Sequence, residues 1–436
     1  MKYLLLLIVF ALTLVRAESS VVSSIPLPRT YVLNLDPYDC DEACLKALIA
    51  HEQVFSFLAQ LPEEVEDPSL KAQRQIYVSL FNLGSEKQNG AFRIAMLLPE
   101  KVIGRYAVST TDSVVAYLLS RNHAFEIETF RTGDENRTAL AEALRKIRQQ
   151  SFHYVIAPLT QKGVENVVSL APQELDIYFP TLNVRDTNGS GDNFYFGGID
   201  YQEQIRALMP DAEVPLVIFY DDSPMGRKLA NQTRTAFLLR FMDEDPQRFL
   251  ELDNAVVSYP VDKRTTNLAN ILKDNPKIDN GTFFLNTPPV KSGMIMSQLT
   301  LYDVNVSRIL STQINYGTLL FDITQPKDRE TMLIANSIET SDDILVETEQ
   351  LLHTDIRFDW INYATAIGAD YFYHLATRSP RTFDLEIVNN QVRYPVKIYR
   401  PLRSRFEPYM PEPESDDDAL DDSNQSEAPT LENGAL

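Results

Sequence analysis

In the central part of the chain, short apolar runs alternate with segments whose apolar residues recur at helical spacing. The runs FRIAMLLP (92–99), FEIETF (125–130) and HYVIAPLT (153–160) predict strands, and ALAEALRKIRQQ (139–150) predicts a helix between the last two. Apolar runs without alternation are typical of parallel strands covered by helices on both faces. The pattern therefore predicts a doubly wound α/β sheet, in which strand ends such as Thr160 lie where ligands bind.

A second series of the same kind begins at VPLVIFYDD, residues 214–222. It continues through strands predicted at 255–260, 282–289 and 307–317, with helices between them. Together the two series span about 310 residues, more than one hydrophobic core usually holds, so two lobes are expected. The stretch 331–407 contains an apolar strand, an aromatic helix and a final strand pair, and we expect it to return the chain to the first sheet.

Helical spacing also marks residues 41–83, ahead of the first strand. An apolar stripe begins at Leu45 and runs to Leu58, and two prolines separate it from a second helix predicted around residues 73–81. Two helices cannot enclose a core alone, so this helical hairpin is expected to dock on the domain that follows.

The first 17 residues, MKYLLLLIVFALTLVRA, combine Lys2, an apolar run and the motif Val15-Arg16-Ala17. This arrangement is typical of a secretory signal peptide cleaved after Ala17. The alternative is an uncleaved N-terminal anchor, although the run is shorter than the roughly 20 residues of a membrane span. No later segment of the sequence is apolar enough to cross a membrane. We therefore expect an exported, periplasmic mature chain without a membrane span.

The chain is strongly acidic, with a formal net charge of −21. Residues 411–436 contribute nine acids and no Lys or Arg, with too little apolar surface to offset ordering entropy, so this segment is predicted to be disordered. An acidic surface repels phosphates, which excludes nucleic acid and anionic lipid surfaces as expected partners. The expected organisation is a signal peptide (1–17), a lead with the helical hairpin (18–90), a first lobe (91–213), a second lobe (214–330), a return to the first lobe with C-terminal strands (331–407) and a disordered acidic tail (408–436).

The two cysteines, Cys40 and Cys44, lie at the start of the first predicted helix. Export to an oxidising compartment favours a disulfide between them. Asp41 can cap the helix and leave Cys40 outside its first turn, free to bend back to Cys44. A free pair of thiols is the alternative, and a metal site would need more ligands than this segment offers.

Sequence motifs for catalysis or metal binding are not found. The five histidines are scattered without metal-ligand spacing, and no nucleophile elbow, P-loop or glycine-rich dinucleotide turn occurs. Asp221 and Asp222 could form a carboxylate pair, but at a strand end such residues more often cap the following helix. We expect a protein that is not an enzyme, with no catalytic residue, no cofactor and no metal.

Six Asn-X-Ser/Thr sequons occur, and four carry an aspartate two residues before the asparagine. Asp/Glu-X-Asn-X-Ser/Thr resembles the acceptor sequence of the bacterial periplasmic oligosaccharyltransferase. These four are glycosylation candidates, although polar loops of an acidic protein also generate such strings. The last lies in the tail, where predicted disorder favours access. The candidates are Asn136, Asn188, Asn305 and Asn424.

The order of these segments resembles the type I periplasmic-binding-protein fold, the two-lobed clamp of branched-chain amino acid receptors. FRIAMLLP and HYVIAPLT match its first lobe, DIYFPTLNV (176–184) matches the strand before a ligand loop, and LVIFYDDSPMGRKLANQTRTAF (216–237) matches the opening of its second lobe. The helix ending GADYFYHLA matches the return helix, so the resemblance covers roughly residues 91–407. The segment ahead is also similar to penicillin-binding-protein activator lipoproteins, although here it is shorter and the lipid anchor is missing. The resemblance implies an α/β clamp of doubly wound parallel sheets, preceded by a short helical module.

In the amino acid receptors of this family, hydroxyls and backbone amides at two strand ends hold the ligand carboxylate, and an acid of the opposite lobe holds its ammonium. Here Gln161-Lys162-Gly163 replaces the expected serine-rich run, and Gln313-Ile314-Asn315-Tyr316 stands where the acid is expected. Because an unpaired buried ammonium costs several kcal/mol, a free amino acid is a poor ligand. The resemblance implies candidate ligand-binding residues Thr160, Gln161 and Asn183 in one lobe, and Asp221, Asn286 and Asn315 in the other.

Two functions remain open at this point. One is an envelope interaction or scaffold protein that keeps the fold and binds a protein partner through its surface. The other is a solute-binding receptor that traps a small neutral or anionic ligand in the inter-lobe cleft. The lost ammonium partner and the added helical module favour the scaffold, although fold alone does not decide function.

Overall fold

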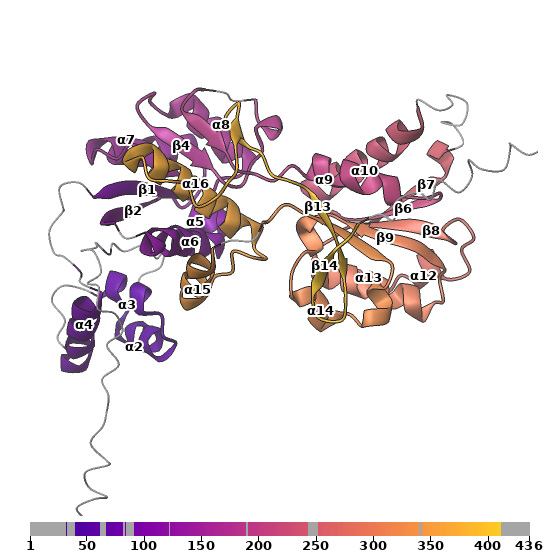
Figure 1. Cartoon of the computed structure of the whole chain (residues 1–436), viewed down its shortest axis with the longest axis horizontal. Helices are drawn as coiled ribbons and strands as arrows, with labels where there is room; N and C mark the ends of the chain where they lie inside the picture. The colour runs from indigo at the N-terminus through magenta and orange to yellow at the C-terminus, as the bar shows by residue number, and fades with distance from the viewer. Residues whose placement is uncertain are drawn as a thin grey trace, which may run out of the picture. The chain divides into compact units, whose positions relative to one another are not determined.

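The computed structural model describes residues 32, 40–61, 67–81, 83, 91–121, 123–188, 191–242, 252–339 and 342–410. The predicted signal peptide (1–17) and residues 411–436 of the predicted tail lie outside these residues. The chain forms two compact units, Met1–Asp200 with Ser337–Pro395 and Tyr201–Asn336 with Val396–Leu436 (Figure 1). Among the described residues, each unit has one seven-stranded sheet. The predicted α/β class with two lobes is confirmed.

The sheet of the first unit has the strand order β11-β12-β5-β4-β3-β1-β2. Its five strands from β5 to β2 are parallel, and the short β11–β12 hairpin extends the sheet beyond β5. Parallel strands bring their carboxyl ends to one edge, which is where the candidate residues follow β3 and β4. The strands are β1 (Phe92–Leu98), β2 (Phe125–Arg131), β3 (Tyr154–Ile156), β4 (Asp176–Phe179), β5 (Phe194–Phe196), β11 (Ile387–Val388) and β12 (Gln391–Val392).

Helices cover both faces of this sheet because successive side chains of its strands point to opposite sides. Along β1, Met96 packs in a cluster with α6 and α16, whereas Leu97 packs in a cluster with α7 and α8. Gly368 allows α16 to lie close to the sheet, since a Cβ there would stand 2.3 Å from Cδ1 of the buried Tyr178. The helices are α5 (Glu100–Ile103), α6 (Tyr106–Ser120), α7 (Arg137–Gln149), α8 (Gln161–Leu170), η1 (Val184–Asp186), α15 (Asp343–Leu351) and α16 (Trp360–Thr377).

The sheet of the second unit has the order β14-β13-β10-β9-β8-β6-β7, with β13 and β14 antiparallel at one edge. Helices α9 and α10 pack on one face, and α12 and α13 pack on the other. The strands are β6 (Leu216–Asp221), β7 (Val256–Val261), β8 (Gly281–Asn286), β9 (Val306–Ser311), β10 (Met332–Asn336), β13 (Lys397–Pro401) and β14 (Phe406–Pro408). The helices are α9 (Tyr201–Leu208), η2 (Met209–Asp211), α10 (Pro224–Met242), α12 (Ala269–Leu272), α13 (Pro289–Leu301), η3 (Gln313–Asn315), α14 (Leu319–Ile323) and η4 (Pro326–Arg329).

The structure divides the chain at other points than the sequence predicts. The first unit ends at Asp200 rather than at 213, because α9 buries its apolar side in the second unit's core. The stretch 331–407 does not return as one block: β10, β13 and β14 join the second sheet, and only Ser337–Pro395 joins the first. The apolar pattern of a strand shows that its side chains are buried. It does not show which of the two sheets the strand joins.

In its described residues, the N-terminal module contains three helices instead of the predicted hairpin of two. They are α2 (Glu42–Ala50), α3 (Val54–Gln60) and α4 (Pro68–Leu80), and Leu45, Phe57 and Leu70 lie in their common core. The expected first helix breaks after α2 because Glu52 takes a left-handed conformation with φ of 59°. No glycine or proline marks that break, so the continuous apolar stripe concealed it.

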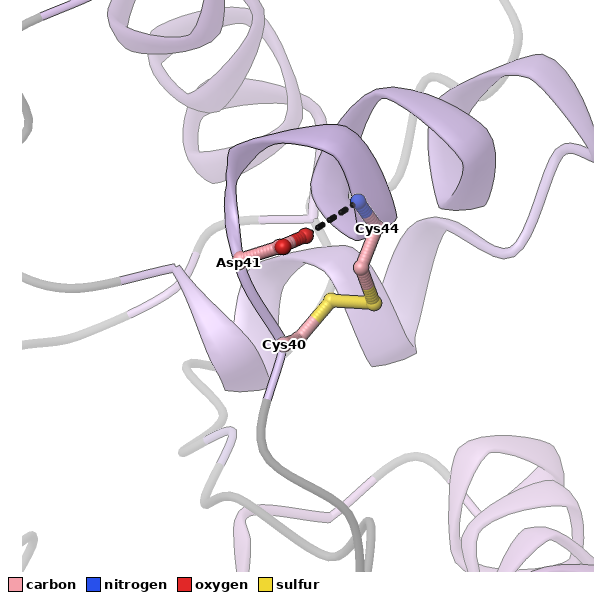
Figure 2. The surroundings of a disulfide bond; sticks show 3 residues. All are labelled: Cys40, Asp41 and Cys44. Atoms are coloured by element: carbon pink, nitrogen blue, oxygen red, sulfur yellow. Dashed lines mark hydrogen bonds between the residues drawn. A yellow bond between two sulfur atoms is a disulfide. The ribbon is translucent and has the colours of Figure 1, made fainter.

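The start of α2 has the predicted capping arrangement. Asp41 is the N-cap residue, and its Oδ1 accepts a hydrogen bond of 2.9 Å from the backbone N–H of Cys44. Figure 2 shows the Sγ atoms of Cys40 and Cys44 joined across this turn, with a Cα–Cα separation of 5.3 Å. Along the described part of the chain, no helix combines the length and the apolar character needed to cross a membrane.

Candidate functional site

Thr160 follows β3 and is the N-cap residue of α8, but an internal carboxylate already holds its polar groups. The backbone N–H of Thr160 donates to Oε1 of Glu135 at 2.7 Å, and its hydroxyl donates to Oε2 of the same carboxylate. The Glu135 side chain is buried, with 6% of the residue exposed. The amide and hydroxyl expected to face a ligand carboxylate are therefore occupied by the protein itself.

Local sequence explains why Glu135 lies against the N-terminus of α8. In the turn before α7, Asp134 Oδ1 accepts from the N–H of Asn136 at 2.8 Å, and Asn136 Oδ1 accepts from the N–H of Ala139 at 2.9 Å. Gly163 supplies the space, since a Cβ there would stand 2.6 Å from Cδ of Glu135. A carboxylate at a helix N-terminus is stabilised by unpaired backbone amides and by the helix dipole.

The other two candidates of the first unit also have internal partners. Gln161 is exposed, and its Nε2 donates to Oε1 of Glu165 at 3.2 Å. Asn183 is 6% exposed and bridges two backbone groups: its Nδ2 donates to the carbonyl of Gly198 at 3.2 Å, and its Oδ1 accepts from the N–H of Arg185 at 3.1 Å. Asn183 therefore holds the loop after β4 in place.

Asp221 and Asp222 follow the capping alternative rather than an acid–base pair. Asp221 Oδ1 accepts from the N–H of Ser223 at 2.9 Å, and Ser223 Oγ accepts from the N–H of Gly226 at 3.0 Å, inside the first turn of α10. Asp222 forms an exposed ion pair with Arg227. These bonds organise the helix start.

Asn286 and Asn315 lie in a buried polar cluster at the carboxyl ends of β8 and β9. Asn286 is 1% exposed and donates from Nδ2 to the hydroxyl of Thr233 at 3.0 Å. Asn315 is fully buried and donates from Nδ2 to Ser311 Oγ at 2.8 Å and to the carbonyl of Thr287 at 3.2 Å. The sequence predicted both asparagines as wall residues but gave no sign of Thr233, which lies in α10, 53 positions before Asn286.

Three oxygen atoms of this cluster have no hydrogen-bond partner within the described part of the chain: Asn286 Oδ1, Asn315 Oδ1 and Thr312 Oγ1. Buried acceptors without partners are uncommon, because each loses its hydration on burial. This edge of the second sheet is therefore suited to groups that donate hydrogen bonds, and no charged side chain takes part in the contacts given above.

A further buried carboxyl group, that of Glu349, was not among the candidate residues. Glu349 in α15 is fully buried, accepts from Ser113 Oγ at 3.1 Å and also accepts from the hydroxyl of Thr354. Burial raises the pKa of Glu349 to about 7. Its partners are internal, so it binds α15 to α6 rather than facing a substrate.

Within the described ranges, no group of three or more His, Cys, Asp and Glu side chains is placed to hold a metal ion. His123 Nδ1 lies 2.8 Å from the carbonyl of Ala124, and His374 Nδ1 lies 2.6 Å from the carbonyl of Ser379. Both histidines thus have structural partners.

Of the glycosylation candidates, Asn136 caps α7, and Asn305 donates from Nδ2 to Asp279 Oδ1 at 3.0 Å. Asn188 is exposed, and Asn424 lies outside the described residues.

No protein-family model matches the chain, and no curated protein matches it by sequence. Solved structures do match. A protein described as a branched-chain amino acid ABC transporter from Rhodospirillum rubrum has a TM-score of 0.56 at 10% identity, covering 73% of this chain and 100% of that chain. The amino acid ABC transporter substrate-binding protein from Pseudomonas fluorescens Pf-5 gives 0.52 at 10% identity, covering 76% and 99%.

The C-domain of LpoA from Haemophilus influenzae, described as a regulator of PBP1A, gives a TM-score of 0.49 at 11% identity, covering 73% and 100%. At that score the similarity supports no argument about this chain. The Rhodospirillum rubrum and Pseudomonas fluorescens structures, which both score above 0.5, establish the fold, which is the two-lobed, type I periplasmic-binding-protein-like architecture. Identities near 10% leave the ligand or partner to be argued from the site.

Proposed function

We propose that the chain is an exported, non-catalytic protein of the cell envelope that uses this fold as an interaction scaffold for a protein partner. The observation that carries the proposal is the hydrogen-bonded contact of Glu135 with the amide and hydroxyl of Thr160. These are the groups that the family resemblance assigns to a ligand carboxylate.

A carboxylate ligand would have to displace Glu135 or lie beside it. Displacement would leave Glu135 buried without its two donors, and an unpaired buried charge costs several kcal/mol. Two carboxylates at one helix N-terminus would also repel each other. Both costs oppose capture of a free amino acid, the ligand class of the receptors that share the fold.

Export belongs to the same proposal. It rests on the signal-peptide pattern of residues 1–17 and on the close spacing of Cys40 and Cys44, which suits an oxidising compartment. We place the protein in the periplasm, with glycosylation at the four aspartate-preceded sequons as a part of its surface.

The second candidate is a receptor for a small neutral solute, and one observation favours it. The unpartnered acceptors Asn286 Oδ1, Asn315 Oδ1 and Thr312 Oγ1 would accept from hydroxyl or amide groups of such a ligand. If the protein is such a receptor, the second unit makes most of the contacts with the solute, and the first unit makes few.

A thermal-shift screen of the mature protein distinguishes the two functions. Under the scaffold proposal, amino acids and neutral hydroxylated compounds leave the melting temperature unchanged. Under the receptor alternative, a ligand at 100 times its Kd adds about 2.7 kcal/mol of stability. Replacing both asparagines, Asn286→Ala with Asn315→Ala, should then abolish the shift. Stabilisation by leucine or isoleucine in the wild type would overturn the scaffold proposal.

A further inference from the structure

The second unit has an apolar pocket on the face covered by α9 and α10. It has a volume of about 580 Å³, within the range of small-ligand and peptide side-chain sites. Its walls include Met209, Pro210, Ala236 and Leu239, and Leu239 is 51% exposed despite being apolar. An exposed leucine at the mouth of an apolar pocket indicates a surface that a further apolar group can cover.

Two arginines stand beside these apolar walls. Arg240 Nη1 donates to the carbonyls of Met209 at 2.6 Å and Ala212 at 2.7 Å, which fixes the guanidinium at the pocket. Arg206 is exposed and forms an ion pair with Glu203 one turn away. Gln232 also lines the pocket, and its buried Oε1 has no partner in the described part of the chain. The pocket therefore suits an apolar group flanked by negative charge and by a hydrogen-bond donor.

The described chain ends beside this pocket. The hydroxyl of Tyr409 donates to Oδ1 of Asp211 at 3.0 Å, and Asp211 directly follows the pocket residue Pro210. The backbone N–H of Tyr409 also donates to the carbonyl of Ile398 at 2.8 Å, so the tyrosine is anchored on both sides. Met410, the last described residue, is 81% exposed. Residues 411–436 therefore begin two positions after Tyr409, an anchored residue that contacts the neighbour of Pro210.

The sequence of this segment matches the chemistry of the pocket. Ala419 and Leu420 interrupt a run of acids, with Asp416, Asp417 and Asp418 before them and Asp421 and Asp422 after them. Leu420 follows Met410 by ten positions, and a chain of that length spans at most about 35 Å. A tethered segment also meets its site at an effective concentration in the millimolar range, which compensates for weak individual contacts.

We propose that the acidic tail docks on its own unit, with Leu420 in the pocket between α9 and α10 and the flanking aspartates facing Arg206 and Arg240. The backbone N–H groups of the tail supply donors for Gln232 Oε1.

Cysteine cross-linking in the full chain tests this contact. We would place one cysteine at the pocket mouth with Leu239→Cys and one beside the proposed anchor with Ala419→Cys, then follow their disulfide formation by mass spectrometry under mild oxidation. Adding Leu420→Ser keeps the tether length identical and removes the apolar anchor. We expect the cross-linking rate to fall at least fivefold, since only random encounters of the tether remain.

The matched control pairs Leu239→Cys with Ala428→Cys. Its cross-linking rate should be the same with and without Leu431→Ser. Arg206→Gln with Arg240→Gln should slow the Ala419→Cys cross-link, as should raised salt. Equal rates with Leu420 and with Leu420→Ser would refute the proposal.

The same variant tests whether a separate anionic amphiphile is the occupant. Decanoate should raise the melting temperature of Leu420→Ser more than that of the wild type, because the wild-type tail competes. An equal rise in both proteins would assign the pocket to a separate ligand and overturn docking of the tail.

Discussion

The carboxylate of Glu135 holds both the backbone N–H and the hydroxyl of Thr160, a residue 25 positions later in the sequence. The contact joins the loop after β2 to the start of α8. It gives the first turn of α8 an acceptor from within the protein.

Replacing this acid should therefore cost stability. Glu135→Ala removes the acceptor of two donors at a helix start, and we expect the free energy of unfolding to fall by about 1–3 kcal/mol. Urea denaturation measures the change. Glu165→Ala, an exposed acid on the same helix, is the control and should stay within about 0.5 kcal/mol of wild type. A Glu135→Ala protein as stable as the control would mean that the contact contributes nothing to the fold.

A second prediction concerns the close approach of α16 to the first sheet. Gly368→Ala would place a Cβ 2.3 Å from Cδ1 of Tyr178, which is fully buried in a closely packed core. Overpacking of this kind costs about 1–3 kcal/mol, and alanine's better helix propensity recovers no more than about 1 kcal/mol. We expect a lower melting temperature than in Gly317→Ala, where a Cβ meets nothing within 4 Å. Equal melting temperatures would show that α16 shifts freely.

The strands could be predicted from the sequence because a strand that is buried on both faces consists almost entirely of apolar residues. FRIAMLLP became β1, with every residue except Arg93 buried. The edges of the sheets could not be predicted in the same way. Strand β13 pairs with β10 of the second sheet, and that choice depends on which edge is open after the chain crosses between units.

The strand ends that precede the candidate residues could be predicted from the sequence, but the partners of those residues could not. Thr160 and Asn315 follow strand ends as expected, yet the sequence did not reveal that Glu135 would fill the first position or that η3 would bury the second. In a sequence, a loop glutamate that becomes buried, such as Glu135, looks the same as one that stays in solvent. Gly163, one turn into α8, is the signal that could have indicated a side chain pressed against that turn.

The Cys40–Cys44 contact predicts an oxidised pair in exported material. Intact mass spectrometry of the unreduced mature protein should give a mass two hydrogens below that of the reduced form. An alkylating reagent applied without reductant serves as the check, and labelling at both cysteines would contradict the prediction.

Glycosylation should be strongest at Asn424 in a host with the periplasmic machinery. Asn136 and Asn305 already have hydrogen-bond partners in the fold, and modification of Asn136 would compete with its role as the cap of α7. We expect a glycan mass that disappears with Asp422→Ala as well as with Asn424→Gln. A glycan that survives Asp422→Ala would mean that the acid is not part of the acceptor signal.

The last prediction follows from the burial of Glu349 between α15 and α6. Its folded-state pKa is raised to about 7, whereas an unfolded glutamate titrates near roughly 4.3. Between these values the folded protein binds more protons than the unfolded chain, so the free energy of unfolding should fall as the pH rises from about 4 to about 7. The full difference is on the order of 4 kcal/mol. Asp355 and Asp359 lie nearby, and burial also raises the pKa of Asp359, which adds a slope of the same sign.

Glu349→Gln keeps the shape of the side chain but cannot ionise, so it should reduce this slope while leaving the contribution of Asp359. Urea denaturation at a series of pH values between 4.5 and 8 compares wild type, Glu349→Gln and Glu347→Gln, an exposed acid of the same helix. The Glu347→Gln curve should run parallel to wild type, and the Glu349→Gln curve should be flatter and cross above it near neutral pH. Parallel curves for all three proteins would mean that Glu349 titrates in the fold as it does in the unfolded chain, and that the contact between α15 and α6 does not depend on its proton.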